Sequence, residues 1–174
     1  MTRESILVAA AYEHPSDAEA AVAELGTDGY GKGDVSLLYT DRGHLAEQGL
    51  ISGALYGGVI GGLVGLLFPP LGIVVAAGPI LGSVASALVT GATVAVAGGA
   101  LSALVSALLQ IGMPKEMADR FGGHVHKGDA LVIVHTSSEE SAKVKGILEG
   151  HNPRAETDEG PAEGAVVMTA VGNA

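Results

Sequence analysis

The chain has 174 residues, a net charge of −10 and 48% apolar residues, and it contains no cysteine. This length fits one medium-sized domain, and the apolar fraction exceeds what the core of such a domain needs. The negative charge argues against general nucleic-acid binding, because phosphate affinity requires a basic surface. The lack of cysteine excludes disulfides, thiolate nucleophiles and zinc–thiolate centres.

The first part of the chain predicts a β-α-β unit. An apolar run at residues 6–12 ends just before Pro15, and because helix is disfavoured ahead of a proline, the run is predicted to be a strand. It is too short for the apolar region of a signal peptide, so we expect no export signal. Ser16 and Glu19 have the spacing of a capping box and begin a predicted helix that ends near Gly26. Apolar residues then alternate along a second strand, at Val35, Leu37 and Tyr39.

The middle of the chain, residues 48–114, contains no Asp, Glu, Lys or Arg. Within it, small residues recur every four positions, a spacing that places them on one face of a helix and lets another helix approach closely. The first stripe is Gly53, Gly57, Gly61 and Gly65, and the second is Ala87, Gly91, Ala95, Gly99, Ala103 and Ala107. The pattern predicts a closely packed helical hairpin, and the same stripes are candidates for self-association.

This hairpin is predicted to lie in a membrane. Residues 50–68 number 19, close to the ~20 that a transmembrane helix needs. Pro69 and Pro70 end that span, residues 71–77 form a turn or a re-entrant segment, and residues 79–98 form the second span. Both flanks must meet in one sheet, so the number of crossings must be even. Basic residues on both flanks favour a cytoplasmic location for the flanks, namely Arg42, Lys115 and Arg120.

Residues 100–111 are too short to cross a bilayer. They carry a polar stripe of Ser102, Ser106 and Gln110 opposite an apolar stripe of Leu101, Leu104, Val105 and Leu108. The pattern predicts a helix that lies at the membrane interface or docks on the flanking domain.

The last part of the chain predicts a second β-α-β unit. A short helix begins at Pro114, runs to about Phe121 and ends at Gly122 and Gly123. Residues 130–135 are the most strand-like run in the chain. A capping box at Ser137 and Glu140 begins a helix that ends at Gly150. Residues 154–158 are the candidate for the last strand, and in the tail, which we expect to be loose, residues 166–171 are a candidate edge strand.

Two β-α-β units joined by an insertion predict an α+β fold, a ferredoxin-like sandwich split between its second and third strands by the glycine-zipper hairpin. The predicted organisation is residues 1–47 as the first half of the domain, 48–113 as the apolar hairpin, 114–159 as the second half and 160–174 as the tail. The hairpin is expected to be a membrane anchor or the core of an oligomer.

The order of these parts resembles the bacterial glycine-zipper general stress proteins, also called low-temperature-induced proteins. The resemblance spans residues 5–158. It rests on the zipper Gly53 to Gly65, the linking Pro69, Gly72, Gly78 and Pro79, the exit at residues 111–116 and the strand at residues 127–134. It implies a non-enzymatic, stress-associated membrane protein and brings no catalytic residues or cofactor. The chain departs from the family pattern in the extra histidines at residues 124 and 126 and in its acidic, apolar tail.

Three histidines are candidate metal ligands. His124 and His126 lie two apart and point the same way if the backbone there is extended, and His135 follows on the next strand. Three imidazoles can bind Zn, Cu or Ni, whereas the alternative is a turn with solvated histidines and no metal.

Two groups of acidic residues could be taken for catalytic carboxylates, but they are expected to be solvated residues of a helix cap or of the tail. The first group is Asp17 and Glu19, and the second is Asp158, Glu159 and Glu163. The glycines from Gly29 to Gly33 predict a turn, because no helix N-terminus follows to hold a phosphate.

Two hypotheses of function remain. In the first, a cytoplasmic ferredoxin-like domain is anchored in the lipid bilayer by a hairpin that also self-associates through Gly53, Gly57, Gly61, Gly65, Gly91, Ala95 and Gly99. In the second, the chain is a soluble homo-oligomeric scaffold or an apolar-ligand carrier, with its apolar helices buried between subunits. Neither hypothesis includes an enzyme, a cofactor or a nucleic-acid partner, because no nucleophile, base and orienting group occur together and the fold alone implies no chemistry.

Overall fold

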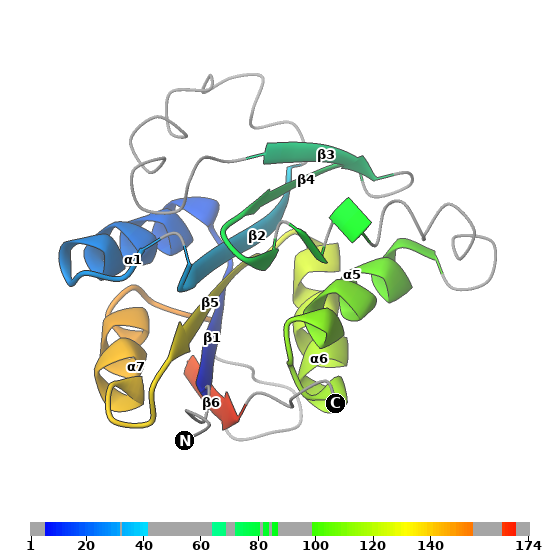
Figure 1. Cartoon of the computed structure of the whole chain (residues 1–174). Coiled ribbons are helices and arrows are strands. Elements are labelled where there is room, and N and C mark those ends of the chain that lie inside the picture. Colours follow the sequence, from blue (N-terminus) through cyan, green and yellow to red (C-terminus); the bar gives the residue numbers. More distant parts are fainter. Residues whose placement is uncertain are drawn as a thin grey trace.

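A computed structural model of the chain describes residues 6–31, 33–41, 64–68, 72–80, 82–83, 85–86, 99–154 and 165–169. They form one six-stranded sheet with helices on both faces (Figure 1). In chain order the elements are β1 (Ile6–Tyr12), α1 (Pro15–Thr27), β2 (Val35–Asp41), β3 (Val64–Phe68), β4 (Gly72–Ala77), α5 (Gly99–Gln110), α6 (Lys115–Lys127), β5 (Ala130–Thr136), α7 (Ser141–Glu149) and β6 (Ala165–Thr169). The α+β class predicted from the sequence is confirmed.

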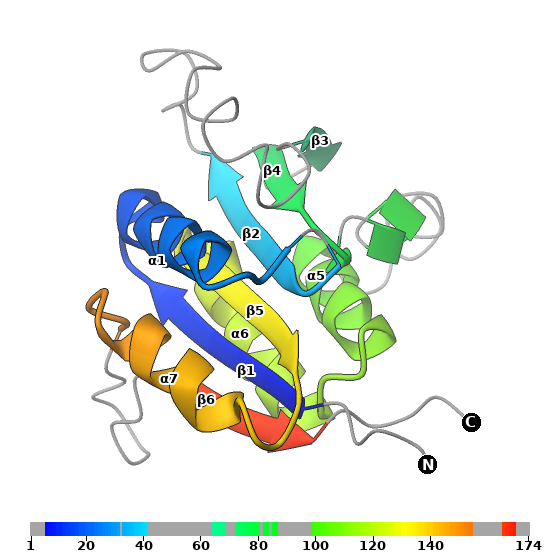
Figure 2. The same cartoon turned by 60° about the vertical axis from the view of Figure 1, so that its left-hand side comes forward.

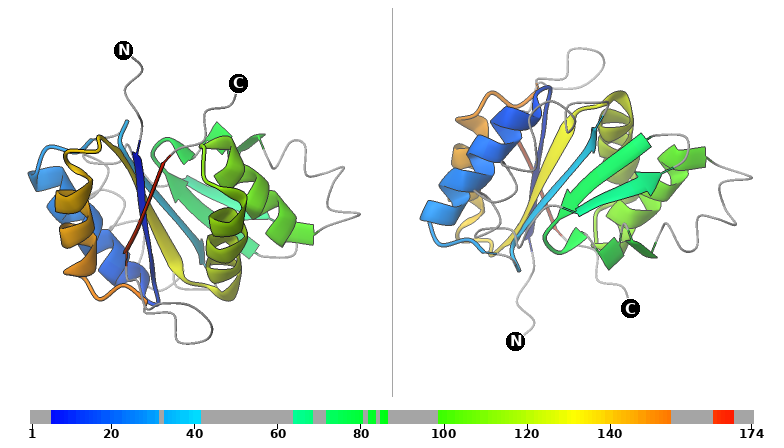
Figure 3. Two further views of the ribbon diagram at one scale, coloured as in Figure 1. Left: turned by 90° about the horizontal axis from the view of Figure 1, so that it is seen from below. Right: turned by 90° about the horizontal axis from the view of Figure 1, so that it is seen from above.

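The strands lie in the order β3-β4-β2-β5-β1-β6, and every neighbouring pair is antiparallel. Helices α1 and α7 cover one face of this sheet, and α5 and α6 cover the other, as the two views of Figure 3 show. The neighbouring strands β5 and β1 run between these helical layers (Figure 2). The sheet is therefore the middle one of three layers.

Both faces of strand β1 are buried, and all seven of its residues lie in the core. Val8, Ala10 and Tyr12 pack with α1 and α7, whereas Leu7, Ala9 and Ala11 belong to the cluster under α5 and α6. A strand covered on both sides carries apolar residues at every position rather than at every second one. This explains why residues 6–12 show no alternation in the sequence.

The predicted membrane hairpin is wrong in the parts that the structure describes. Gly65 lies in strand β3. The segment 71–77 was expected to be a turn or a re-entrant segment, but its residues 72–77 form β4. These two strands pair with each other, and β4 also pairs with β2, so the apolar insertion extends the sheet. Of the other packing residues predicted, Gly99 is the first residue of α5, and Gly53, Gly57, Gly61, Gly91 and Ala95 lie outside the described residues.

Within the described part of the chain, no helix combines the length and the apolar character that crossing a bilayer requires. This finding contradicts the predicted transmembrane helices and membrane localisation. The second predicted span, residues 79–98, contains helical residues only at 80, 82, 83, 85 and 86 among those described. The described apolar residues of this stretch are instead used in strand pairing and in contacts between layers.

Helix α5 docks on the domain, which was one of the two alternatives predicted for residues 100–111. Leu104, Ala107 and Leu108 are buried in the core cluster that also contains residues of β1 and β5. The neighbouring helix α6 does not end at Gly122 and Gly123 as predicted. It continues to Lys127 and ends at Gly128, whose φ of 108° is a left-handed conformation that glycine adopts without strain.

The last strand also differs from the prediction. Arg154 is not in a strand, and residues 155–158 lie outside the described residues. Strand β6 instead comes from the tail that was expected to be loose, and it pairs with β1 at the end of the sheet. The edge strand suggested at residues 166–171 therefore exists, with its bounds at Ala165–Thr169.

Candidate functional site

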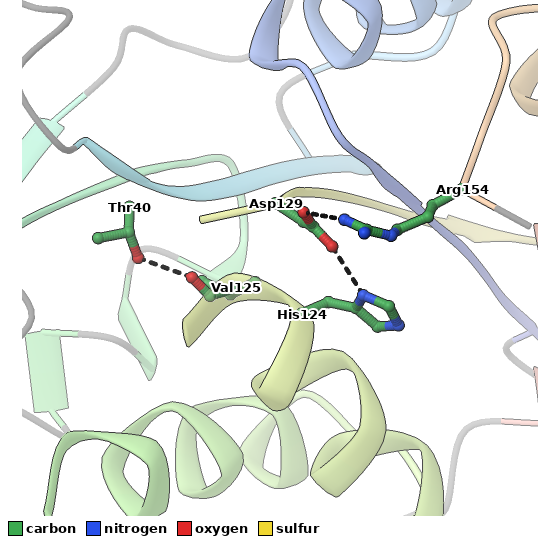
Figure 4. Close-up of polar contacts among 5 residues, drawn as sticks. All are labelled: Thr40, His124, Val125, Asp129 and Arg154. Carbon is green, nitrogen blue, oxygen red and sulfur yellow. Dashed lines mark hydrogen bonds and ion pairs between the residues drawn. The ribbon is translucent and has the colours of Figure 1, made fainter. Parts of the chain in front are cut away.

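The most polar buried feature of the described residues is a cluster of three side chains around Asp129 (Figure 4). Asp129 follows the left-handed Gly128 at the end of α6 and directly precedes β5, and only 4% of its surface is exposed. Its carboxylate accepts a hydrogen bond from His124 on one oxygen and from Arg154 on the other, each at 2.7 Å. A buried carboxylate requires such partners, because ionised groups are costly to remove from water without them.

Arg154 comes to this cluster from the segment that follows α7. Its backbone N–H donates to the carbonyl of Ala11 at 2.7 Å, which places it at the end of β1. Its guanidinium Nη1 donates to Oδ1 of Asp129. Two residues earlier, Asn152 has a φ of 54°, a left-handed conformation that asparagine tolerates and that turns the chain toward the sheet. The cluster thus joins β1, β5 and the segment after α7.

His124 lies in the last turn of α6, and its side chain is only 11% exposed. Because a carboxylate only accepts hydrogen bonds, Nδ1 of His124 carries the hydrogen that is shared with Oδ2 of Asp129. The same two residues are also joined by a backbone hydrogen bond, in which the N–H of Asp129 donates to the His124 carbonyl at 3.0 Å. The ring of Phe121, one helical turn earlier, has its centroid 6.5 Å from that of His124. The imidazole is therefore fixed in orientation and tautomer.

An aspartate and the histidine that it orients are two of the three members of a catalytic triad, and the third is a nucleophile. The chain has no cysteine. Thr40, a buried hydroxyl on β2, donates its hydrogen to the carbonyl of Val125 at 2.9 Å (Figure 4). The end of α6 is thus bonded to two polar side chains. One is Thr40 from β2, and the other is Asp129, which precedes β5. This arrangement holds α6 against the sheet.

The three candidate metal ligands are not brought together. The prediction placed His124 and His126 on an extended backbone, but both belong to helix α6, where residues two apart point in nearly opposite directions. His124 is buried beside Asp129, and His126 is exposed. His135 lies near the far end of β5, roughly 17 Å along the strand from Ala130 at ~3.3 Å per residue. In the part of the chain that is described, no group of three or more His, Cys, Asp or Glu side chains is arranged to hold a metal ion.

The other acidic and glycine-rich candidates have structural roles where they are described. Asp17 lies in the first turn of α1, where a carboxylate is favoured by the helix dipole. Glu19 is half-buried on the same helix, and burial raises its pKa. The turn after α1 is closed by Asp34, whose Oδ2 accepts the N–H of Gly31 at 3.1 Å. The acidic residues of the tail, Asp158, Glu159 and Glu163, lie outside the described residues.

The cluster of His124, Asp129 and Arg154 was not predicted from the sequence. The available signal was an acidic residue that directly precedes the most apolar strand, where an unpaired charge is costly. The partner Arg154 carried no signal, because its approach depends on the turn at Asn152 and on the bond to Ala11.

Comparison of the chain with models of known protein families, with curated protein sequences and with solved structures found no significant match.

Proposed function

We propose that the chain is a non-enzymatic, self-associating scaffold protein of the glycine-zipper general stress type, built on a ferredoxin-like unit with an apolar insertion. The observation that carries the proposal is the outer surface of α5, which has no charged residue and exposes two leucines on a chain whose net charge is −10. The stress association rests on the sequence resemblance of residues 5–158.

The ferredoxin-like part of the proposal is supported by four neighbouring strands and two helices. Strands β6, β1, β5 and β2 lie side by side in that order, and all three pairings are antiparallel. Helix α1 connects β1 to β2, α7 follows β5, and both helices pack on the same face of the sheet. The inserted part lies between β2 and β5 and includes β3, β4, α5 and α6. It adds two strands at one edge and a helical layer on the other face (Figure 3).

Self-association is supported by the exposure of Leu101 and Leu109 on α5, at 38% and 37%. They lie two helical turns apart on α5. Val105 lies between them but is partly buried, with one methyl group toward Gly122 of α6, so the exposed apolar surface consists of the two leucines. Residues 99–114 contain no charge that would oppose the approach of another acidic chain. Apolar surface of this kind at a charge-free place is typical of contacts between proteins. We favour a scaffold over an apolar-ligand carrier because this surface faces outward.

The absence of enzymatic activity is the other part of the proposal. It is supported by the cluster around Asp129, the most polar buried place in the described residues. There the carboxylate is bonded on both oxygens, and the nearby hydroxyl of Thr40 is bonded to a backbone carbonyl. These bonds fix a helix end to the sheet.

Sedimentation equilibrium of the full chain, from low to high micromolar concentration and without detergent, tests self-association. We expect an oligomer whose mass is a multiple of that of the chain. Replacing Leu101 and Leu109 by glutamine should weaken association by about tenfold or more, which corresponds to ~1.4 kcal/mol. The control is Ser106→Gln, which makes an exposed polar residue of the same helix into a larger polar one and should leave the mass unchanged. A monomer at every concentration would overturn the proposal.

A further inference from the structure

Strand β6 forms one end of the sheet, and among the described residues no strand pairs with its outer edge. It pairs with β1 on one side and is the last strand in the sheet order. Its sequence, Ala-Val-Val-Met-Thr, contains none of the lysines or prolines with which proteins usually block edge pairing. At its centre, Val167 is 41% exposed, more than any other large apolar side chain in the described part of the chain.

The exposed side chain lies beside α7. Val167 is directly opposite Val8 in the β1–β6 ladder, and side chains of directly paired residues lie on the same face of a sheet. Val8 is buried in the cluster that contains residues of α1 and α7. Of these two helices, α7 is the one that packs over β1 and β6 (Figures 1 and 2). The edge of the domain is therefore formed by β6 together with one side of α7.

The charges on that side of α7 balance. Lys143 pairs with Asp28 at the end of α1, at 3.5 Å, so the side of α7 that carries Lys143 faces α1. Lys145, two residues further on, lies on nearly the opposite side of the helix, toward β6. It pairs with Glu149 at 3.6 Å. The helix side that flanks β6 thus carries one lysine and one glutamate and is neutral, on a chain with ten excess negative charges.

We propose that a second copy of the chain pairs with this edge, β6 against β6 in antiparallel orientation, about a two-fold axis next to Val167. This inference rests on the proposed self-association and adds a second contact surface to the one on α5. The symmetric register pairs Ala165 with Thr169 of the other copy and Val167 with itself, so the contact is isologous and closed. The same axis places the two α7 helices antiparallel, with Lys145 of each copy near Glu149 of the other. Charges of opposite sign therefore meet twice.

The helices are needed as well as the strands. A stable dimer buries about 1,200–2,000 Å² in total, which is more than two five-residue strands supply. The flanks of α7 add contact area on the face where Val167 is exposed. The pairing also joins two six-stranded sheets into one continuous sheet, in which the β6 strand of each copy has a partner on both sides.

Cysteine cross-linking of the full chain tests the surface directly, because the natural sequence contains no cysteine. Directly opposite residues of an antiparallel pair have Cα atoms about 4.5–5.5 Å apart, within the range that a disulfide spans. Under mild oxidation, Val167→Cys should give a covalent dimer on a non-reducing gel. Thr27→Cys, an exposed residue at the end of α1, is the control and should stay monomeric.

A charge exchange tests the helix contact. Lys145→Glu should weaken dimerisation by about tenfold, because it places like charges opposite each other, and adding Glu149→Lys should restore it. Failure of Val167→Cys to cross-link while the natural chain is still an oligomer in sedimentation would overturn the β6 interface and leave self-association standing. A natural chain that is monomeric would overturn both.

Discussion

The carboxylate of Asp129 and the guanidinium of Arg154, which are 25 residues apart in the chain, lie 2.7 Å from each other. The same carboxylate binds His124 at the end of α6, so one buried side chain connects the helical layer on one face of the sheet to the segment that follows α7 on the other. Loss of this carboxylate should therefore destabilise the whole domain.

Asp129→Ala should lower the free energy of unfolding by about 1–3 kcal/mol, because it leaves two buried or half-buried donors without their acceptor. Because the side chain of Arg154 is 39% exposed, this loss of unfolding free energy should be smaller than the loss on breaking a fully buried ion pair. Urea unfolding at neutral pH measures the change. The control is Asp119→Ala, which removes an exposed pair with Lys115 and should cost no more than about 0.5 kcal/mol. Equal costs would contradict the structural role of Asp129.

The prediction of a helical hairpin was wrong because the four-residue spacing of its small residues does not distinguish a helix from a strand. A repeat of four residues places side chains on one face of a helix, but four is also an even number, so the same residues share one face of a strand. The stripe that ends at Gly65 is therefore compatible with both structures, and the structure has β3 there. The absence of charge had a similar ambiguity, because a segment buried between sheet and helices excludes charges just as a bilayer does.

The flanking elements were predictable because their signals are local. Pro15 and the apolar faces of α1 and α7 correspond to helices in the structure, and the buried residues of α1 are the ones that line its predicted face, namely Ala18, Ala21, Val22 and Leu25. The predicted capping boxes are wrong, because the residues that precede the two helices are His14 and Glu140, and neither makes a side-chain capping bond. The end of α6 was not predictable from local signals. Gly122 and Gly123 looked like a helix stop, but one of them is needed for a contact with α5.

Gly122 lies at a close contact between α5 and α6. A Cβ atom at this position would lie 2.9 Å from Cγ2 of Val105, whose β-branched side chain cannot easily rotate away. Gly122→Ala should therefore destabilise the protein by about 1–3 kcal/mol through overpacking. Gly123→Ala is the matched control, since nothing lies within 4 Å of its Cβ, and the gain in helix propensity should stabilise by about 0.5–1 kcal/mol. Thermal unfolding of the two variants should shift in opposite directions.

A second substitution distinguishes this contact from a simple loss of chain flexibility. Adding Val105→Ala to Gly122→Ala removes the obstructing methyl group, so the double variant should cost less than the sum of its single changes. Costs that merely add would show that Gly122 is not limited by Val105.

Gly78 should tolerate no side chain. It has a φ of 77°, and a Cβ atom there would lie 1.9 Å from the backbone carbonyl oxygen of Val35. Both the left-handed conformation and the backbone contact oppose substitution, so Gly78→Ala should cost about 3 kcal/mol or more. Gly82→Ala, a helical position with nothing within 4 Å of its Cβ, is the control. Similar midpoints of urea unfolding for the two variants would contradict this close approach of β2 and the turn after β4.

Tyr12 should make the protein unstable in alkali. Its hydroxyl is buried and donates to the carbonyl of Leu148 at 2.8 Å, and burial, with the nearby charge of Asp17, raises its pKa well above the usual value of about 10. Above pH 10 the unfolded chain loses this proton while the folded chain keeps it. The stability gained from the raised pKa is therefore complete below pH 10 and falls by up to ~1.4 kcal/mol per pH unit above it.

The variant Tyr12→Phe tests this assignment. At pH 8 it should lower the free energy of unfolding by about 1 kcal/mol, because the Leu148 carbonyl loses its donor. Urea unfolding should then show a smaller decline for this variant than for the natural chain between pH 9.5 and 11, and parallel declines would contradict the assignment of the proton to Tyr12.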